Sequence, residues 1–137
     1  MRGISVYHSA QRAAHDPQQF EHDALLRTAR EMEAAEHGPG RERILALHRN
    51  TKLWQAFAAD CSESGNQLPD DIRAKIVSLA LWVYNHTEKA IIGELPVRPL
   101  AEVNRTIAKG LAAAIEARNA DTPAPPPLKA AGDYADF

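Results

Sequence analysis

Apolar residues recur at steps of three and four positions along residues 100–115, and this spacing constrains the fold more than any other feature of the sequence. An α-helix turns by about 100° per residue, so residues at this spacing share one face. The apolar positions are Leu100, Val103, Ile107, Leu111 and Ile115. The pattern predicts a helix from near Leu100 to about Arg118.

A second stretch, residues 41–61, shows the same spacing. Its helical stripe comprises Ile44, Leu47, Thr51, Trp54, Ala58 and Cys61. Strand-like alternation of β-branched or aromatic residues with polar ones is rare in the chain, whereas helix-forming residues such as Ala, Leu, Glu and Arg are frequent. These patterns predict an all-α fold. A chain of 137 residues is expected to form one domain.

The first predicted helix begins after Asp16. This residue is a suitable N-cap, because its carboxylate can accept a hydrogen bond from a free backbone N–H, and Pro17 suits the first helical position. The helix should run to about Glu36, where the sequence HGPG ends it. Gly38 suits a left-handed cap at that end. Because few apolar residues lie on this helix, we expect it to pack only lightly.

Another helix is predicted from Pro69 to about Ile92, which gives a small bundle of about four helices over residues 16–118. Residues 1–15 are expected to form an N-terminal arm or a short helix. Residues 119–137 contain four of the nine prolines of the chain. We expect them to form a disordered Pro-rich tail, because proline favours an extended backbone without core contacts.

The predicted helix that starts at Pro69 carries more apolar side chains than one buried face can hold. Its core face comprises Ile72, Ile76, Leu79, Val83, Thr87 and Ala90. A second apolar strip, on nearly the opposite side, comprises Val77, Leu81, Tyr84 and Ile92. Trp82 projects to a flank of the core face. A helix that is apolar nearly all round is either buried centrally or presents a face to a partner.

Two explanations of the second strip remain open at this point. The first predicted helix, the N-terminal arm or the fourth helix can cover it. Alternatively, the strip binds an amphipathic helix of another protein. The candidate partner-binding residues are Val77, Leu81 and Tyr84, with Trp54 or Trp82 at the margin of the contact.

Residues with catalytic or metal-binding chemistry are scattered along the chain. The six histidines form neither an H-x₃-H nor an H-E-x-x-H pattern, so no metal site is predicted. Cys61 falls on the apolar stripe of its helix and is interpreted as a small core residue. No phosphate-binding glycine loop or nucleophile elbow is present. We therefore expect no enzymatic activity, no catalytic residues and no cofactor.

The charge balance is slightly acidic. The formal net charge is −2, the pI is near 6.3, and Lys and Arg are spread along the chain, so direct nucleic-acid binding is not expected. No apolar run approaches the roughly 20 residues of a membrane-spanning helix, and the first residues lack the apolar region of a signal peptide. The expected location is the cytoplasm, with no membrane partner.

Several short motifs occur in order between about residues 4 and 115. They are Tyr7-x-x-Ala10-Gln11-Arg12 with Pro17 and Glu21, Asn50-x-x-x-Trp54, Asp60-Cys61, Asn66-Gln67-Leu68-Pro69, Arg73-Ala74-x-Ile76-x-Ser78-Leu79-x-x-Trp82-Val83 with His86-Thr87, and Pro99-Leu100-x-x-Val103-Asn104-x-x-Ile107-x-x-Gly110-Leu111. As an ordered set, these motifs resemble the FlaF family of flagellar biosynthesis regulators.

The resemblance implies a small, cytoplasmic, helical and non-enzymatic protein of alphaproteobacteria that is needed for flagellin synthesis or secretion. It implies flagellin as the partner, bound by a chaperone or positive regulator that acts alongside the translational regulator FlbT. It supplies no catalytic residues, and the proposed binding residues come from the helical spacing alone.

Two other functions stay open from the residues. The first is a general helical interaction module unrelated to motility. The second is a regulator that acts on flagellin mRNA or the ribosome, which requires a set of basic residues to converge on one face. That set comprises Arg41, Arg43, Arg49, Lys52, Arg73 and Lys75.

Overall fold

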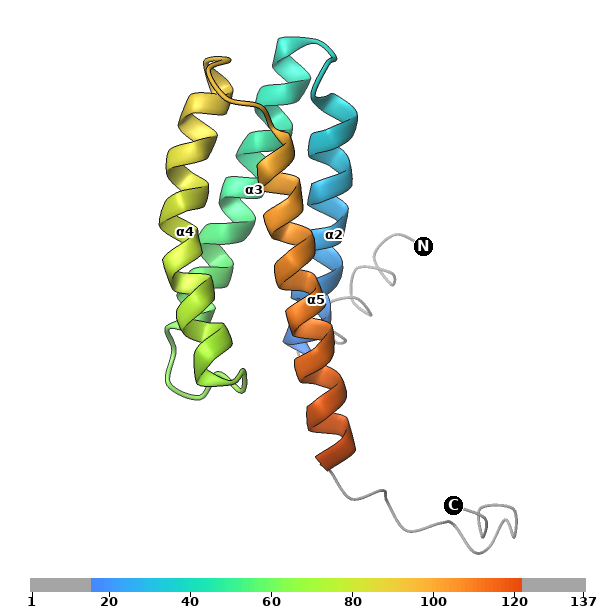
Figure 1. Cartoon of the computed structure of the whole chain (residues 1–137), viewed down its shortest axis with the longest axis vertical. Coiled ribbons are helices and arrows are strands. Elements are labelled where there is room, and N and C mark those ends of the chain that lie inside the picture. Colours follow the sequence, from blue (N-terminus) through green and yellow to red (C-terminus); the bar gives the residue numbers. More distant parts are fainter. Residues whose placement is uncertain (1–15, 122–137) are drawn as a thin grey trace, which may run out of the picture.

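Four helices make up the computed structural model, which describes residues 16–121. They are α2 (Pro17–Ala35), α3 (Gly40–Cys61), α4 (Asp70–Ile91) and α5 (Arg98–Asp121). Each helix runs antiparallel to the next, and α5 continues beyond the end of the bundle (Figure 1). The predicted all-α bundle of about four helices is confirmed. The predicted N-terminal arm and the residues after Asp121 lie outside the described part of the chain.

The helix ends follow the sequence signals except at Gly38. The Asp16 carboxylate caps α2 by accepting a hydrogen bond from a backbone N–H of the first turn at 3.2 Å. Gly93, with φ 81°, closes α4 in the left-handed conformation that glycine tolerates best. Gly38 has no such conformation, and its N–H donates to the Ala35 carbonyl at 3.1 Å. The predicted left-handed cap there was wrong, because Glu36 leaves α2 with right-handed backbone angles.

The most extensive helix pair is that of α2 and α5. Ala29 of α2 and Ala101 and Ala108 of α5 are buried, and such small side chains allow two helices to approach closely. The Arg105 guanidinium also donates two hydrogen bonds to the Glu33 carboxylate, one of them at 2.8 Å. The expectation that the first helix packs only lightly was wrong, because small residues on α5 compensate for its few large apolar ones.

A buried hydrogen-bond network joins α2, α3 and α5. The indole Nε1 of Trp54 donates to Asn104 Oδ1 at 2.8 Å. Asn104 Nδ2 donates to Asn50 Oδ1 at 2.7 Å and to Thr28 Oγ1 at 3.2 Å. All four side chains are buried. Because the three hydrogen bonds of Asn104 require side chains of all three helices to lie at fixed heights, the network sets the register of these helices.

Helix α4 is held less completely than the others. It packs against α3, touches α5 far less, and has no contact with α2. Much of its surface therefore depends on α3 alone for cover. Along residues 16–121, no helix combines the length and apolar character that crossing a lipid bilayer requires.

Candidate interaction surface on helix α4

Val77, Leu81 and Tyr84 form an apolar strip on the surface of α4, which we call the outer strip. Leu81 is 67% exposed and Val77 is 43% exposed. Tyr84 is half-buried and packs against the core, and this burial raises the pKa of its hydroxyl. Neither α2 nor α5 covers Leu81, so the explanation that relied on the first or fourth helix was wrong. The N-terminal arm lies outside the described residues.

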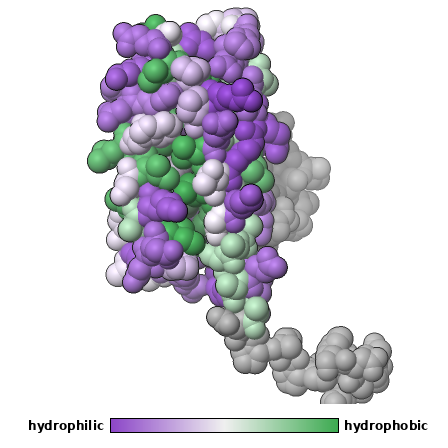
Figure 2. Space-filling model, viewed as in Figure 1, coloured by the Kyte–Doolittle hydropathy of each residue, from purple (hydrophilic) through white to green (hydrophobic). Residues whose placement is uncertain are grey.

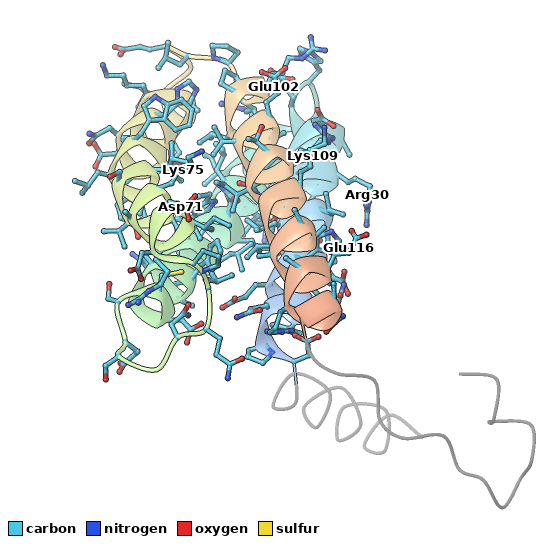
Figure 3. All side chains as sticks on the ribbon, turned by 60° about the horizontal axis from the view of Figure 1, so that its bottom comes forward. Arg30, Asp71, Lys75, Glu102, Lys109 and Glu116 are labelled. Carbon is cyan, nitrogen blue, oxygen red and sulfur yellow. The ribbon has the colours of Figure 1, made fainter. Side chains whose placement is uncertain are left out.

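Trp82 lies on a different flank of α4 and is 38% exposed. Its ring is 4.9 Å from the His86 ring, with the two planes tilted by 33°. The Nε2 of His86 is 2.7 Å from the carbonyl of Pro96, in the segment that leads into α5. Lys75 and Asp71 project from this same side of α4 (Figure 3). Trp82 therefore belongs to the side of α4 that is turned towards α5, apart from the outer strip.

Trp54 cannot belong to a partner-binding surface in this fold. Its side chain is fully buried, its Nε1 is bonded to Asn104, and its ring meets Phe57 edge to face at 5.7 Å. The prediction that placed it at the margin of the contact was wrong. The reason was visible in the sequence, because Trp54 shares the core stripe of α3 with Leu47 and Cys61.

Sequence reasoning missed apolar surface outside the outer strip. Ile44 and Leu45, near the start of α3, are exposed, although Ile44 was predicted to be core. On the other side, Figure 2 shows an apolar band along the surface between α4 and α5, with polar residues on both sides. Leu79 of α4 and Val103 of α5 are half-buried against the core. The band follows from the limited contact between α4 and α5.

Two arginines fasten α3 to α4 at opposite ends of the pair. The guanidinium of Arg43 donates to the backbone carbonyls of Ala90 and Ile91. The Nε of Arg73 donates to the carbonyl of Cys61 at 2.9 Å. These contacts fix the alignment of the two helices. They also occupy two of the six basic residues that an RNA-binding face would require.

Glu21 of α2 and Asp60 near the end of α3 form a pair of neighbouring carboxyl groups. Burial, a hydrogen bond to Asp60 and repulsion from the Asp60 charge, in that order, raise the pKa of Glu21 to about 8. One carboxyl oxygen of Glu21 is buried without a partner among the described residues. Burial and the same two acidic residues raise the pKa of Cys61 to about 12. Its thiol is therefore unreactive, as expected of a core residue.

The stability of the protein is expected to fall as the pH rises from about 5 to about 8. Glu21 has an ordinary pKa of 4.5 and a folded-state pKa of about 8. Between these values the folded state keeps a proton that the unfolded state has lost, so rising pH favours unfolding. Glu21→Gln should remove much of this slope in a series of melting temperatures. The control is Glu42→Gln on the exposed surface of α3, and an unchanged slope in Glu21→Gln would assign the effect to other groups.

The fold and the surface together define a small four-helix protein with an exposed apolar strip on α4. No three His, Cys, Asp or Glu side chains gather into a metal-binding group within residues 16–121. The model of the flagellar protein FlaF family matches residues 4–111. The chain therefore belongs to the FlaF family of flagellar proteins. A search among curated proteins and a search among solved structures found no match.

Proposed function

We propose that this protein binds flagellin in the cytoplasm, as a non-enzymatic chaperone or positive regulator of flagellin synthesis and secretion, and that the outer strip makes the contact. Membership of the FlaF family supports a flagellar role. The observation that carries the proposal is Leu81, which lies in the middle of α4 and is 67% exposed. A solvated leucine side chain contributes little to the free energy of folding. Its burial by a partner would favour binding by up to about 2 kcal/mol.

The outer strip suits one amphipathic helix of a client. Val77, Leu81 and Tyr84 follow each other at steps of four and three residues, as they must to line one face of a helix. A client helix lying beside α4 would bury these side chains together with its own apolar stripe. The strip is small, so the contact should be weak and reversible, as a chaperone that releases its client for export requires.

Leu81→Asp is expected to weaken flagellin binding at least about 100-fold, because the partner would bury a carboxylate against apolar side chains. The measurements are co-purification of co-expressed flagellin and a binding titration with the purified proteins. Because Leu81 is largely solvated, the far-UV circular dichroism and the melting temperature should stay close to those of the unchanged protein.

Phe20→Asp provides the matched control. Phe20 is 50% exposed, and it lies on α2, which does not contact α4. This variant should bind flagellin normally. Full binding by Leu81→Asp would show that the outer strip is not the site. Absence of flagellin from the eluate of the unchanged protein would instead favour an interaction module unrelated to motility.

A role beside the regulator FlbT belongs to the same proposal and rests on membership of the FlaF family alone. Direct action on flagellin mRNA is less well supported. Arg43 and Arg73 bond to backbone carbonyls, and Lys75 projects from the side of α4 that faces α5. The basic residues named for such a role therefore do not form one free face.

A further inference from the structure

The apolar band between α4 and α5 is only partly covered by the residues that the structure describes. Its half-buried members, which pack against the core, are Ile72, Leu79, Val103 and Ala114. The two helices make little contact with each other, and the band runs along the surface between them (Figure 2). A further element of suitable length and charge would complete its burial.

Gly110 of α5 lies in the same band. Arg105 bonds to Glu33 of α2, and Gly110 and Ala114 lie on nearly the opposite side of α5 from Arg105, because a helix turns by about 100° per residue. Where a Cβ on Gly110 would stand, no atom of the described residues lies within 4 Å. A glycine weakens the middle of a helix, but its missing side chain lets another segment approach the backbone closely.

Residues 1–15 lead into α2 beside the end of this band. Arg118, one turn beyond Ala114 on α5, donates hydrogen bonds to Asp16 and Gln18. Asp16 has φ −143° and ψ 76°, and a residue before proline disfavours the helical conformation. The preceding segment therefore cannot continue the axis of α2, and the chain has to turn at Asp16, next to α5.

The segment has the length and the apolar spacing of a helix that would fit the band. Residues 4–14 would form about three turns, as do residues 103–114 of α5. The apolar residues that recur at steps of three and four positions are Val6, Tyr7, Ala10, Ala13 and Ala14. This spacing places them on one face of a helix. The alanines of that face would allow a close approach to Gly110 and Ala114.

The charge of the segment is opposite to that of the bundle end where it enters. Residues 1–15 contain Arg2 and Arg12 and no Asp or Glu. At this end of the bundle, Arg73 and Arg118 are each paired with an aspartate. Four other charged residues are exposed there and form no ion pair within the described part of the chain, namely Glu63, Asp71 and Glu116, which are acidic, and Lys75, which is basic. The uncompensated charge is therefore negative, which favours a basic segment.

The other terminus of the chain fits the band less well. The model of the FlaF family begins at residue 4 and stops at residue 111, so it includes most of the first segment and none of the last. Residues 122–137 start where α5 has already continued beyond the bundle (Figure 1), and they contain two aspartates and one lysine. Neither their starting point nor their charge suits the band.

We propose that residues 4–14 form a fifth helix that packs on the apolar band, antiparallel to α4, with Tyr7 over Gly110 and Ala10 beside Ala114. This direction follows because the segment leads towards the end of the bundle at which α4 begins. The fifth helix leaves the outer strip, on the far side of α4, free for a partner. The inference is independent of the proposed function, because Leu81→Asp tests the outer strip and leaves the band unchanged.

Disulfide formation in full-length double-cysteine variants tests the position of the segment. Ala10→Cys with Ala114→Cys should form an intrachain disulfide at least about tenfold faster than Ala10→Cys with Leu81→Cys, because docking raises the local concentration of the two thiols. Cys61 can stay in both variants, because it is buried. Faster reaction of the Leu81 pair would place the segment on the outer strip and overturn the inference. Equal rates, or disulfides only between two chains, would overturn it as well.

The sign of a stability change at Gly110 provides a second test. On an uncovered helix, Gly110→Gln should raise the melting temperature, because glycine is a poor helix former and the space around it is open. Under a docked segment, the same substitution should lower the melting temperature by about 5 °C, because the new side chain would hold the segment away. A higher melting temperature of this variant in the full-length protein would overturn the inference.

Tyr7→Asp makes the complementary change on the segment, and Ser5→Asp is its matched control. Both variants add one negative charge to the same segment, but Ser5 falls on the opposite face of the predicted helix from Tyr7. Tyr7→Asp should lower the melting temperature by about 5 °C and Ser5→Asp by no more than about 1 °C. With Tyr7→Asp already present, Gly110→Gln should no longer lower the melting temperature. Equal effects of the two aspartates would overturn the inference.

Discussion

Trp54→Ala is expected to lower the free energy of unfolding by about 4 kcal/mol. The substitution removes the largest fully buried side chain of the core and leaves a cavity that the surrounding helices cannot fill. It also removes the donor that bonds to Asn104 Oδ1, so a buried acceptor loses its partner. For a domain of this size, such a loss is a large share of the total stability.

Urea unfolding followed by circular dichroism measures this change. Trp82→Ala is the matched control, because the same side chain is removed where it is 38% exposed and its ring lies 4.9 Å from the ring of His86. The control should lose no more than about 1.5 kcal/mol, since less apolar surface is uncovered. Similar losses in the two variants would contradict the assignment of Trp54 to the core and Trp82 to the surface.

Asn104→Ala is expected to lower the free energy of unfolding by about 3 kcal/mol. Asn104 is the residue at which the network of α2, α3 and α5 meets, and it bonds to Trp54, Asn50 and Thr28. Without it, the indole N–H and the amide oxygen of Asn50 are left buried, and each unsatisfied group costs about 1 to 3 kcal/mol. The Asn50 amide nitrogen already lacks a partner among the described residues, so the loss of Asn104 would leave both polar atoms of that buried amide unsatisfied.

The control for this second prediction is Asn85→Ala, at an exposed position on α4, which should change stability by no more than about 0.5 kcal/mol. A double variant adds a sharper test. Trp54 and Asn104 share a hydrogen bond, so the combined loss should be smaller than the sum of the single losses. Strict additivity would mean that the bond between them contributes nothing.

The helices themselves were predictable from the chain. Asp16 and Pro17 set the start of α2, and Gly93 the end of α4, because capping depends on residues within one turn of each end. The predicted core positions Ile76 and Val83 of α4 are buried. The prediction missed Ala80 and His86, which lie at the edges of the same face and are also buried. Their burial depends on how widely the neighbouring helices cover α4.

Some properties of the partner-binding candidates depend on local helical spacing, and others depend on which helices pack together. Spacing alone showed that α4 has two apolar faces, since the helical period is a local property of the backbone. It did not show which face another helix covers. Leu81 stays exposed because α2 packs on α5 instead of on α4, and that pairing depends on small residues and a polar network far apart in the chain.

The sequence by itself determined four helices, their ends, the excess of apolar side chains on one of them and membership of the FlaF family. Only the tertiary structure decided that Leu81 faces solvent and that Ile44, on the predicted core stripe of α3, is exposed. The physical reason is that hydrogen bonding and side-chain periodicity act within a few residues, whereas burial is set by which helices meet. In this protein, the contacts of Arg43 and Arg73 and the Asn104 network determine which helices pack together.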